Sequence, residues 1–130
     1  MIFITVGTQK FQFNRLLKEI DRLIEEEKIT EEVFAQIGYS GYKPKNYNYK
    51  DFIDRDEFED IIKKCKIIIT HGGTGSIIGA VKQRKKVVAV PRLKEFGEHV
   101  DDHQIQIVSE FESIGFIEAA QSVEMLGNTI

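Results

Sequence analysis

The sequence contains one cysteine, no excess of basic residues and no long hydrophobic run, and each absence excludes a class of protein. Because Cys65 is alone, the chain can form neither an internal disulfide nor a cysteine-based metal site, which fits a reducing, cytoplasmic setting. The formal net charge of −3 argues against nucleic acid as a partner, since nucleic-acid binders usually carry a basic excess. The apolar N-terminus, residues 1–6, is too short for a signal peptide, and no segment approaches the length of a membrane span. We therefore expect a membrane role, if the protein has one, to come through a partner.

Short apolar runs alternate with helical periodicity along the 130 residues, which suffice for one domain, 1–130, with a real core. Strands are expected at residues 2–6, 33–38, 66–70 and 87–90, with a last short strand at 115–117 and another near 49–53. Helices are expected near 13–27, from Asp54 or Asp56 to Cys65, from the glycines after residue 71 to about Arg84, and over 101–111. This alternation predicts an α/β fold, with a Rossmann-like parallel sheet and helices on both faces.

Four polar loops follow the expected strands, at residues 7–9, 53–56, 71–76 and 91–104. In a parallel sheet these loops line one edge, and ligands bind at the carboxyl ends of the strands. Their convergence points to a ligand site more strongly than any one motif does.

The segment His71-Gly72-Gly73-Thr74-Gly75-Ser76 directly follows the apolar run at residues 67–70, and helical periodicity resumes after it. Glycines allow the backbone to turn tightly and to approach a ligand. The start of the next helix offers unpaired N–H groups and a positive dipole end, which suit phosphate. The hydroxyl of Ser76 and the imidazole of His71 supply further donors, although a Gly-rich turn without a ligand is the simpler alternative.

Asp102, His103 and Gln104 open a helix at the same edge. A carboxylate, an imidazole and an amide together suit sugar hydroxyls, which need both donors and acceptors. The neighbouring Asp101 makes a metal site conceivable, but no matching ligand elsewhere has suitable spacing, so no metal is expected.

Several kinds of site are excluded. The sequence has no Gly-Lys-Ser/Thr and hence no P-loop, and no serine stands in a nucleophile elbow. The glycines at 73, 75 and 79 resemble a dinucleotide fingerprint, but they follow the fourth expected strand and no substrate domain accompanies them.

Taken together, these residues resemble the C-terminal, nucleotide-sugar-binding half of GT-B glycosyltransferases of the family 28 type. The resemblance is strongest to single-domain subunits of two-chain transferases, of the dolichol-pathway and the capsule or exopolysaccharide kind. It rests on residues 3–8, 52–53, 70–78, 90–92 and 101–104, and it spans essentially the whole chain in the right order.

The resemblance implies a set of site residues. The diphosphate would be held by the first loop and the glycine turn, and uracil would lie against Phe52 and Ile53, mostly at their backbone. The ribose or donor sugar would meet Gln104, with Asp102 or His103 beside it. The implied donor-binding residues are Gly7, Thr8, Phe52, Ile53, His71, Gly73, Thr74, Gly75, Ser76, Asp102, His103 and Gln104, and the catalytic candidates are His71 and His103.

The chain departs from the resembled pattern in two ways. Many GT-B enzymes carry a ribose-binding glutamate three residues after the position of Ser76, where this chain has Gly79. The acceptor-binding half is also missing, which implies a membrane-associated partner subunit and a location at the inner membrane face. Without that partner, the isolated chain could pair with itself as a homodimer.

The resemblance implies transfer of a sugar, of the galactose, glucuronic acid or GlcNAc class, from a UDP-sugar to a lipid-linked saccharide. The reaction would invert the anomeric carbon and need no cofactor. The general base is expected on the partner first, and at His99 or His103 second. Two alternatives remain open: a non-catalytic accessory subunit of such a transferase, and a dinucleotide-binding domain.

Overall fold

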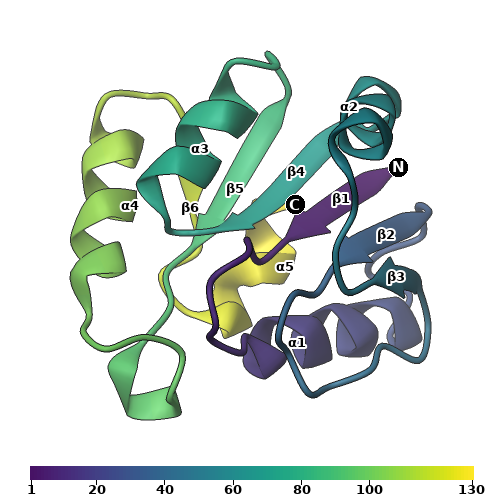
Figure 1. Ribbon diagram of the computed structural model, residues 1–130, viewed down its shortest axis with the longest axis horizontal. Coiled ribbons are helices and arrows are strands. Elements are labelled where there is room, and N and C mark those ends of the chain that lie inside the picture. Colours follow the sequence, from purple (N-terminus) through teal and green to yellow (C-terminus); the bar gives the residue numbers. More distant parts are fainter.

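The computed structural model describes residues 1–130, which form a six-stranded sheet in the order β3-β2-β1-β4-β5-β6 (Figure 1). Every pair of neighbouring strands is parallel. This arrangement confirms the expected Rossmann-like α/β fold. The strands are β1 (Ile2–Thr5), β2 (Val33–Gln36), β3 (Asn48–Lys50), β4 (Ile67–His71), β5 (Lys86–Val90) and β6 (Glu118–Ala119).

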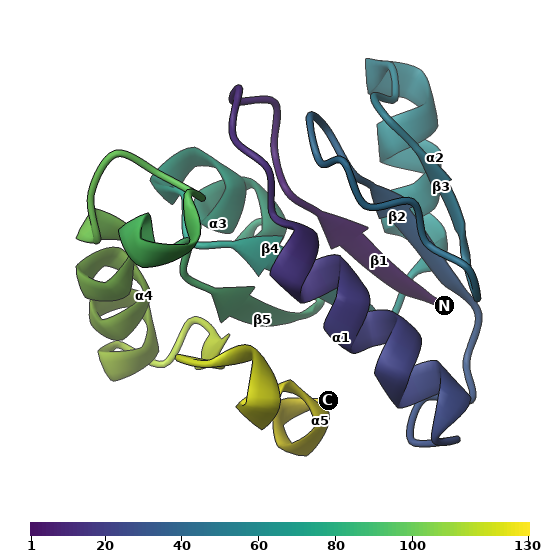
Figure 2. The same cartoon turned by 90° about the horizontal axis from the view of Figure 1, so that it is seen from below.

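Helices cover both faces of the sheet, as expected from the apolar strands. Figure 2 shows α1 and α5 together on one side of the sheet, and α2 and α3 lie on the other. The α-helices are α1 (Asn14–Glu25), α2 (Arg55–Lys64), α3 (Thr74–Val81), α4 (His103–Ser113) and α5 (Leu126–Thr129), and two 3₁₀ turns are η1 (Lys94–Phe96) and η2 (Val123–Met125).

Alternation along β1 divides the core between the two faces. Ile2 and Ile4 pack with the apolar stripe of α1, whereas Phe3 packs on the other face with residues of α2, α3 and α4. All three side chains are buried, because successive residues of a strand point to opposite faces and both faces are covered. The α1 stripe consists of Leu16, Leu17, Ile20 and Leu23.

Two helix boundaries follow from local chemistry. The Asp54 carboxylate accepts a hydrogen bond from the Glu57 backbone N–H at 2.8 Å, so Asp54 rather than Asp56 is the N-cap of α2. Helix α3 ends at Val81, earlier than expected, and the chain reaches β5 through a turn in which Arg84 is left-handed (φ 58°).

The expected last strand at residues 115–117 is wrong by a few residues. Gly115 has φ +82° and follows the end of α4, and the N–H of Phe116 returns to the carbonyl of Phe111. This left-handed closing turn is a common helix end, and it favours glycine. Strand pairing begins only at Glu118, opposite Val88.

Candidate functional site

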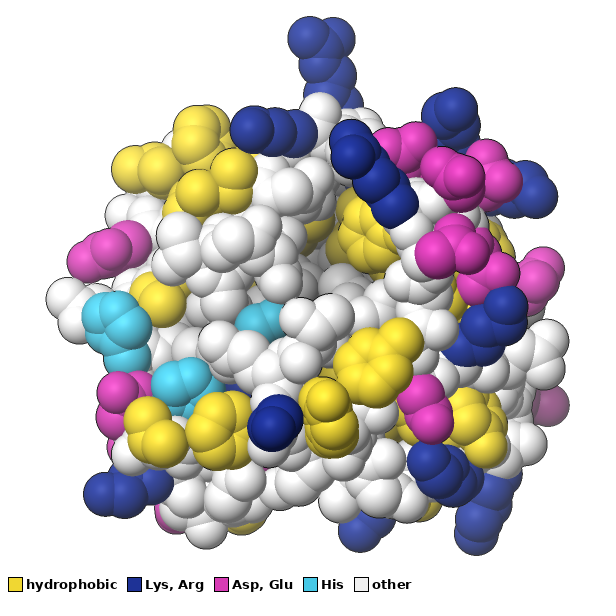
Figure 3. Space-filling model, in the orientation of Figure 1, with side chains coloured by type: hydrophobic (Ala, Val, Ile, Leu, Met, Phe, Trp, Pro, Cys, Tyr) yellow, Lys and Arg dark blue, Asp and Glu magenta, His cyan; other side chains and the backbone are white.

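A cavity of about 560 Å³ opens at the carboxyl ends of β1 and β4, the two central strands. The strand order reverses between them, and this is where doubly wound sheets bind ligands. Figure 3 shows the surface hollowed between the regions of α2 and α3. The lining residues are Thr5, Gly7, Thr8, Gln9, Gln36, Ile53, Asp54, Arg55, Phe58, Ile62, Ile68, His71, Gly73, Thr74, Gly75, Ser76, Gly79 and Ala80.

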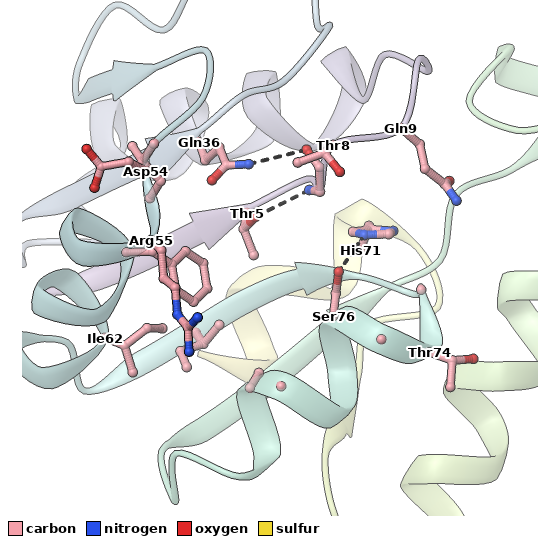
Figure 4. Close-up of a pocket in the computed structure, with 18 residues that line it drawn as sticks. Thr5, Thr8, Gln9, Gln36, Asp54, Arg55, Ile62, His71, Thr74 and Ser76 are labelled. Atoms are coloured by element: carbon pink, nitrogen blue, oxygen red, sulfur yellow. Dashed lines mark hydrogen bonds between the residues drawn. The ribbon is translucent and has the colours of Figure 1, made fainter.

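The loop after β1 lies directly against His71. Gly7 has φ +76°, and a Cβ built there would lie 2.6 Å from the Nε2 of His71. Only glycine meets both conditions at low cost, since it tolerates a left-handed backbone and has no side chain. Gln36 holds the turn from β2 by donating to the carbonyl of Gly7 at 3.5 Å, as Figure 4 shows.

The glycine turn joins β4 to α3 and forms the opposite wall. Gly73 is the N-cap of α3 and supplies no side-chain acceptor for the first N–H groups of the helix. These groups carry the positive end of the helix dipole, beside the cavity-lining Thr74, Gly75 and Ser76. The wall is therefore suited to an anionic group such as a phosphate.

His71 lies at the base of this turn and is only 4% exposed. Its Nε2 lies 3.0 Å from the Oγ of Ser76, and its Nδ1 faces Gln104 and Arg92 (Figure 4 shows the first contact). Burial, and secondarily the nearby Arg92 guanidinium, lower the pKa of His71 from 6.5 to about 4. The imidazole is therefore neutral at physiological pH.

Arg92 is a fully buried cation behind the cavity. Its guanidinium donates to the backbone carbonyls of Val6, Phe11, Gln12 and Glu98, and it lies over the ring of Phe13. Burial lowers the pKa of Arg92 to about 10, which leaves it charged at neutral pH. Its positive charge adds to that of the helix terminus.

The structure brings eight of the twelve predicted donor-binding residues together around the cavity: Gly7, Thr8, Ile53, His71, Gly73, Thr74, Gly75 and Ser76. Phe52, Asp102, His103 and Gln104 lie outside the lining. The ring of Phe52 is exposed and meets Tyr39 edge-on at 5.2 Å. The Asp102 carboxylate accepts from the backbone N–H of Lys94 at 2.8 Å and so shapes the loop before α4.

His103 and Gln104, both at the start of α4, differ in exposure. His103 is exposed, and its predicted catalytic role stays a prediction. Gln104 is 3% exposed, and its Oε1 accepts from the backbone N–H groups of Gly72 and Arg92, each at 3.0 Å. The Gln104 amide thus joins two neighbouring loops, and its predicted ligand contact stays a prediction.

Gln9, Gln36 and Arg55 are among the polar residues of the lining that the implied donor-binding set leaves out. Gln9 and Gln36 extend from the ends of the first two strands, and Arg55 follows the N-cap of α2. Figure 4 shows the guanidinium of Arg55 directed into the space between α2 and α3. The position of Arg55 in one of the polar loops expected at this edge was a signal that could have identified it.

The structure contains no group of three or more His, Cys, Asp or Glu side chains arranged to hold a metal ion. None of its helices combines the length and the apolar character needed to cross a membrane.

Comparison with known proteins agrees with this geometry. The model of the glycosyltransferase family 28 C-terminal domain matches residues 1–130. The UDP-N-acetylglucosamine transferase subunit ALG13 of Candida glabrata is 28% identical over 102 residues, which cover 78% of this chain and 46% of that protein. The chain thus spans about half the length of this relative.

Solved glycosyltransferases share the fold at low sequence identity. MurG of Acinetobacter baumannii has a TM-score of 0.64 at 18% identity, with 96% of this chain and 39% of that chain covered. SnogD of Streptomyces nogalater has a TM-score of 0.62 at 19% identity, with 94% of this chain and 31% of that chain covered. The glycotransferase of kitacinnamycin has a TM-score of 0.65 at 13% identity, with 99% of this chain and 34% of that chain covered. The fold is therefore that of one half of a GT-B glycosyltransferase, and the chain belongs to the glycosyltransferase family 28 C-terminal domain family.

Proposed function

We propose that this chain binds the UDP-sugar donor of a glycosyltransferase that transfers a hexose to a lipid-linked saccharide. A membrane-associated partner subunit binds the acceptor and holds the chain at the inner membrane face. The observation that carries the proposal is the cavity at the ends of β1 and β4, where a glycine turn and the N-terminus of α3 face a buried, neutral histidine. The printed name of the Candida glabrata relative, a UDP-N-acetylglucosamine transferase subunit, supports it.

The two sides of the cavity suit the two parts of the donor. One side is apolar, with Ile53, Phe58 and Ile62 between β1 and α2, and we place the uracil there. The other side is the glycine turn, where N–H groups, Ser76 and Thr8 would receive the diphosphate. The sugar would then project toward the open mouth of the cavity.

In the proposed reaction, an acceptor hydroxyl attacks the anomeric carbon from the face opposite the diphosphate. The new C–O bond forms as the bond to the β-phosphate oxygen breaks, so the electron pair of that bond leaves with UDP and the configuration inverts. The developing charge on UDP meets the N-terminus of α3 and the Ser76 hydroxyl, which stabilise it. The hydroxyl proton passes to a base, which we place on the partner subunit.

Titration calorimetry of the isolated chain with UDP, uridine and NADPH tests the donor site. We expect saturable binding of UDP and none of NADPH. Ser76→Ala should weaken UDP binding about tenfold, because a hydrogen bond to a charged group is lost, and should leave uridine binding unchanged. Ser113→Ala, an exposed serine at the end of α4, is the matched control.

A second variant tests whether the glycine turn itself receives the ligand. A Cβ at Gly73 would lie 2.4 Å from the Cε1 of His71, so a substitution there would displace the histidine as well. At Gly75 a Cβ meets nothing within 4 Å, and Gly75→Val should therefore block UDP while the domain stays folded. Unchanged UDP binding in Gly75→Val would remove the turn from the site.

The accessory alternative has one specific observation in its favour. Gly79 lines the cavity without a side chain, where a carboxylate could have bound the ribose. Absence of UDP binding in the isolated, folded chain would favour an accessory subunit, and preference for NADPH would favour a dinucleotide-binding domain.

A further inference from the structure

The orientation of the Gln104 amide is fixed by the two backbone groups that it meets. The backbone N–H of Gly72 and that of Arg92 both point at the same terminal atom, each at 3.0 Å. A backbone N–H can only donate, so this atom is the carbonyl oxygen Oε1. The other terminal atom is therefore the amide nitrogen Nε2, which lies 3.3 Å from the Nδ1 of His71.

The same two residues determine which nitrogen of His71 carries the proton. The Gln104 amide nitrogen only donates, and so does the Arg92 guanidinium, whose Nε lies 3.5 Å from the same Nδ1. Since both neighbours are donors, Nδ1 must accept and cannot bear a hydrogen. A neutral imidazole then holds its proton on Nε2.

The neutral state itself follows from the surroundings of the ring. His71 is 4% exposed, and the charged or titratable groups that act on it are Arg92 and His99. Neither is an anion that would stabilise an imidazolium. The pKa of about 4 agrees with this geometry.

The proton on Nε2 decides what Ser76 can do. Nε2 lies 3.0 Å from the Oγ of Ser76, so the N–H donates and the hydroxyl oxygen accepts. Ser76 makes no other side-chain hydrogen bond, and its hydroxyl lines the cavity. Its hydrogen is consequently available to a ligand.

We propose that Gln104 and Arg92 are positioning residues that hold His71 as its Nε2–H tautomer, so that Ser76 presents its hydroxyl hydrogen to an anionic ligand. That the ligand is the diphosphate of a UDP-sugar rests on the proposed function, whereas the tautomer does not. One consequence is that His71 cannot serve as the general base, because its only lone pair faces two donors. Ser76 is thereby made a donor toward anions before any ligand arrives.

Nuclear magnetic resonance of ¹⁵N-labelled histidine tests the inference in the free protein. Two-bond correlations distinguish a protonated from an unprotonated ring nitrogen. We expect one histidine with Nε2 protonated and Nδ1 unprotonated, unchanged from about pH 8 down to about pH 5. His71→Gln identifies the resonance by its loss. An Nδ1–H tautomer, or a rapidly exchanging mixture, would overturn the proposal.

Gln104→Glu tests which residue sets the tautomer. A carboxylate can still accept from Gly72 and Arg92, so the loops keep their connection, but it presents no N–H to His71. We expect Nδ1 to become protonated at about pH 8, because the new carboxylate accepts its hydrogen and the remaining donor, the Nε of Arg92, is more distant at 3.5 Å. A neutral ring then has no hydrogen on Nε2, and UDP affinity should fall about tenfold. Gln106 is an exposed glutamine on the same helix, and Gln106→Glu should change neither the protonation of His71 nor the affinity for UDP.

The protonation of His71 and the affinity for UDP are measured separately, so failure of this inference can be distinguished from failure of the proposed function. If UDP does not bind but His71 carries its proton on Nε2 and Gln104→Glu moves it, the tautomer stands and the donor proposal fails. If UDP binds but Nδ1 stays unprotonated in Gln104→Glu, Gln104 has only a structural role and the inference fails.

Discussion

Gly79 is the residue at which the cavity has room for a further ligand contact. A Cβ built there meets nothing within 4 Å, and the position lies on α3, three residues after Ser76. A carboxylate at this point could accept hydrogen bonds from ribose hydroxyls, which are donors. We therefore expect Gly79→Glu to raise UDP affinity by about fivefold to tenfold, measured by calorimetry.

The control for this variant is Gly79→Leu, which fills the same space without a carboxylate. Both substitutions should increase the helix propensity of α3, by up to about 1 kcal/mol, so a difference between them isolates the polar contact. Equal UDP affinity in the two variants would mean that the ribose does not come within reach of position 79.

Local and distant contacts at the residue scale differ in how well the sequence predicts them. His71 and Ser76 are five positions apart on one turn, and the sequence placed both at the site as donors, although it did not predict their mutual contact. The contacts of Gln104 with Gly72 and Arg92 span 32 and 12 positions. The sequence around a glutamine at a helix start is the same whether its amide contacts a ligand or the backbone. Only the fold shows which of the two contacts is made.

At the scale of elements, Arg92 joins the loops that surround the cavity. Its side chain bonds to the loop after β1 and to the loop after β5, and it also meets His71 at the end of β4. Arg92→Met would leave several buried carbonyl oxygens without a donor, each costing about 1–3 kcal/mol where no water replaces it. We expect this variant to lower the free energy of unfolding by about 3–5 kcal/mol in urea denaturation.

Two further variants make the Arg92 prediction specific. Arg84→Met removes an exposed arginine from the turn between α3 and β5 and should change the unfolding free energy by less than about 0.5 kcal/mol. Arg92→Lys keeps the charge, but an ammonium group cannot donate to several carbonyls at once as the guanidinium does. Most of the decrease in the free energy of unfolding should therefore remain. Full stability in Arg92→Lys would show that the charge alone matters.

The spacing of apolar residues predicted the central elements well, because the burial of these elements follows a regular pattern along consecutive residues. The apolar runs of β1, β4 and β5 and the stripe of α1 are examples. The edge strand β6 was misplaced because only two of its residues pair, and their register is set by Val88 and Ala89 some 30 positions earlier. Edge elements of this kind depend on a distant partner more than on their own pattern.

At the scale of the whole molecule, the fold class followed from the alternation of elements, but the strand order did not. The pairing of β1 with both β2 and β4 places the reversal of the sheet beside Gly7 and His71. The convergence of polar loops at one edge could be predicted, but only three of the four expected loops line the cavity, because no residue of 91–104 does. The choice of these two strands as the centre of the site needed the long-range pairing.

The buried neutral His71 also affects the stability of the whole domain. Its pKa is about 4 in the folded state and about 6.5 when unfolded, so between these values the unfolded chain binds more protons. Stability should therefore fall as the pH decreases from about 6.5 to about 4, by at most about 3 kcal/mol from this group, and this contribution should be constant above about pH 7. His71→Gln should flatten the pH dependence of the urea midpoint in this window, whereas His103→Gln, at an exposed position, should preserve it. An equal acid slope in wild type and His71→Gln would mean that other groups govern the acid sensitivity, and that burying this imidazole contributes little to it.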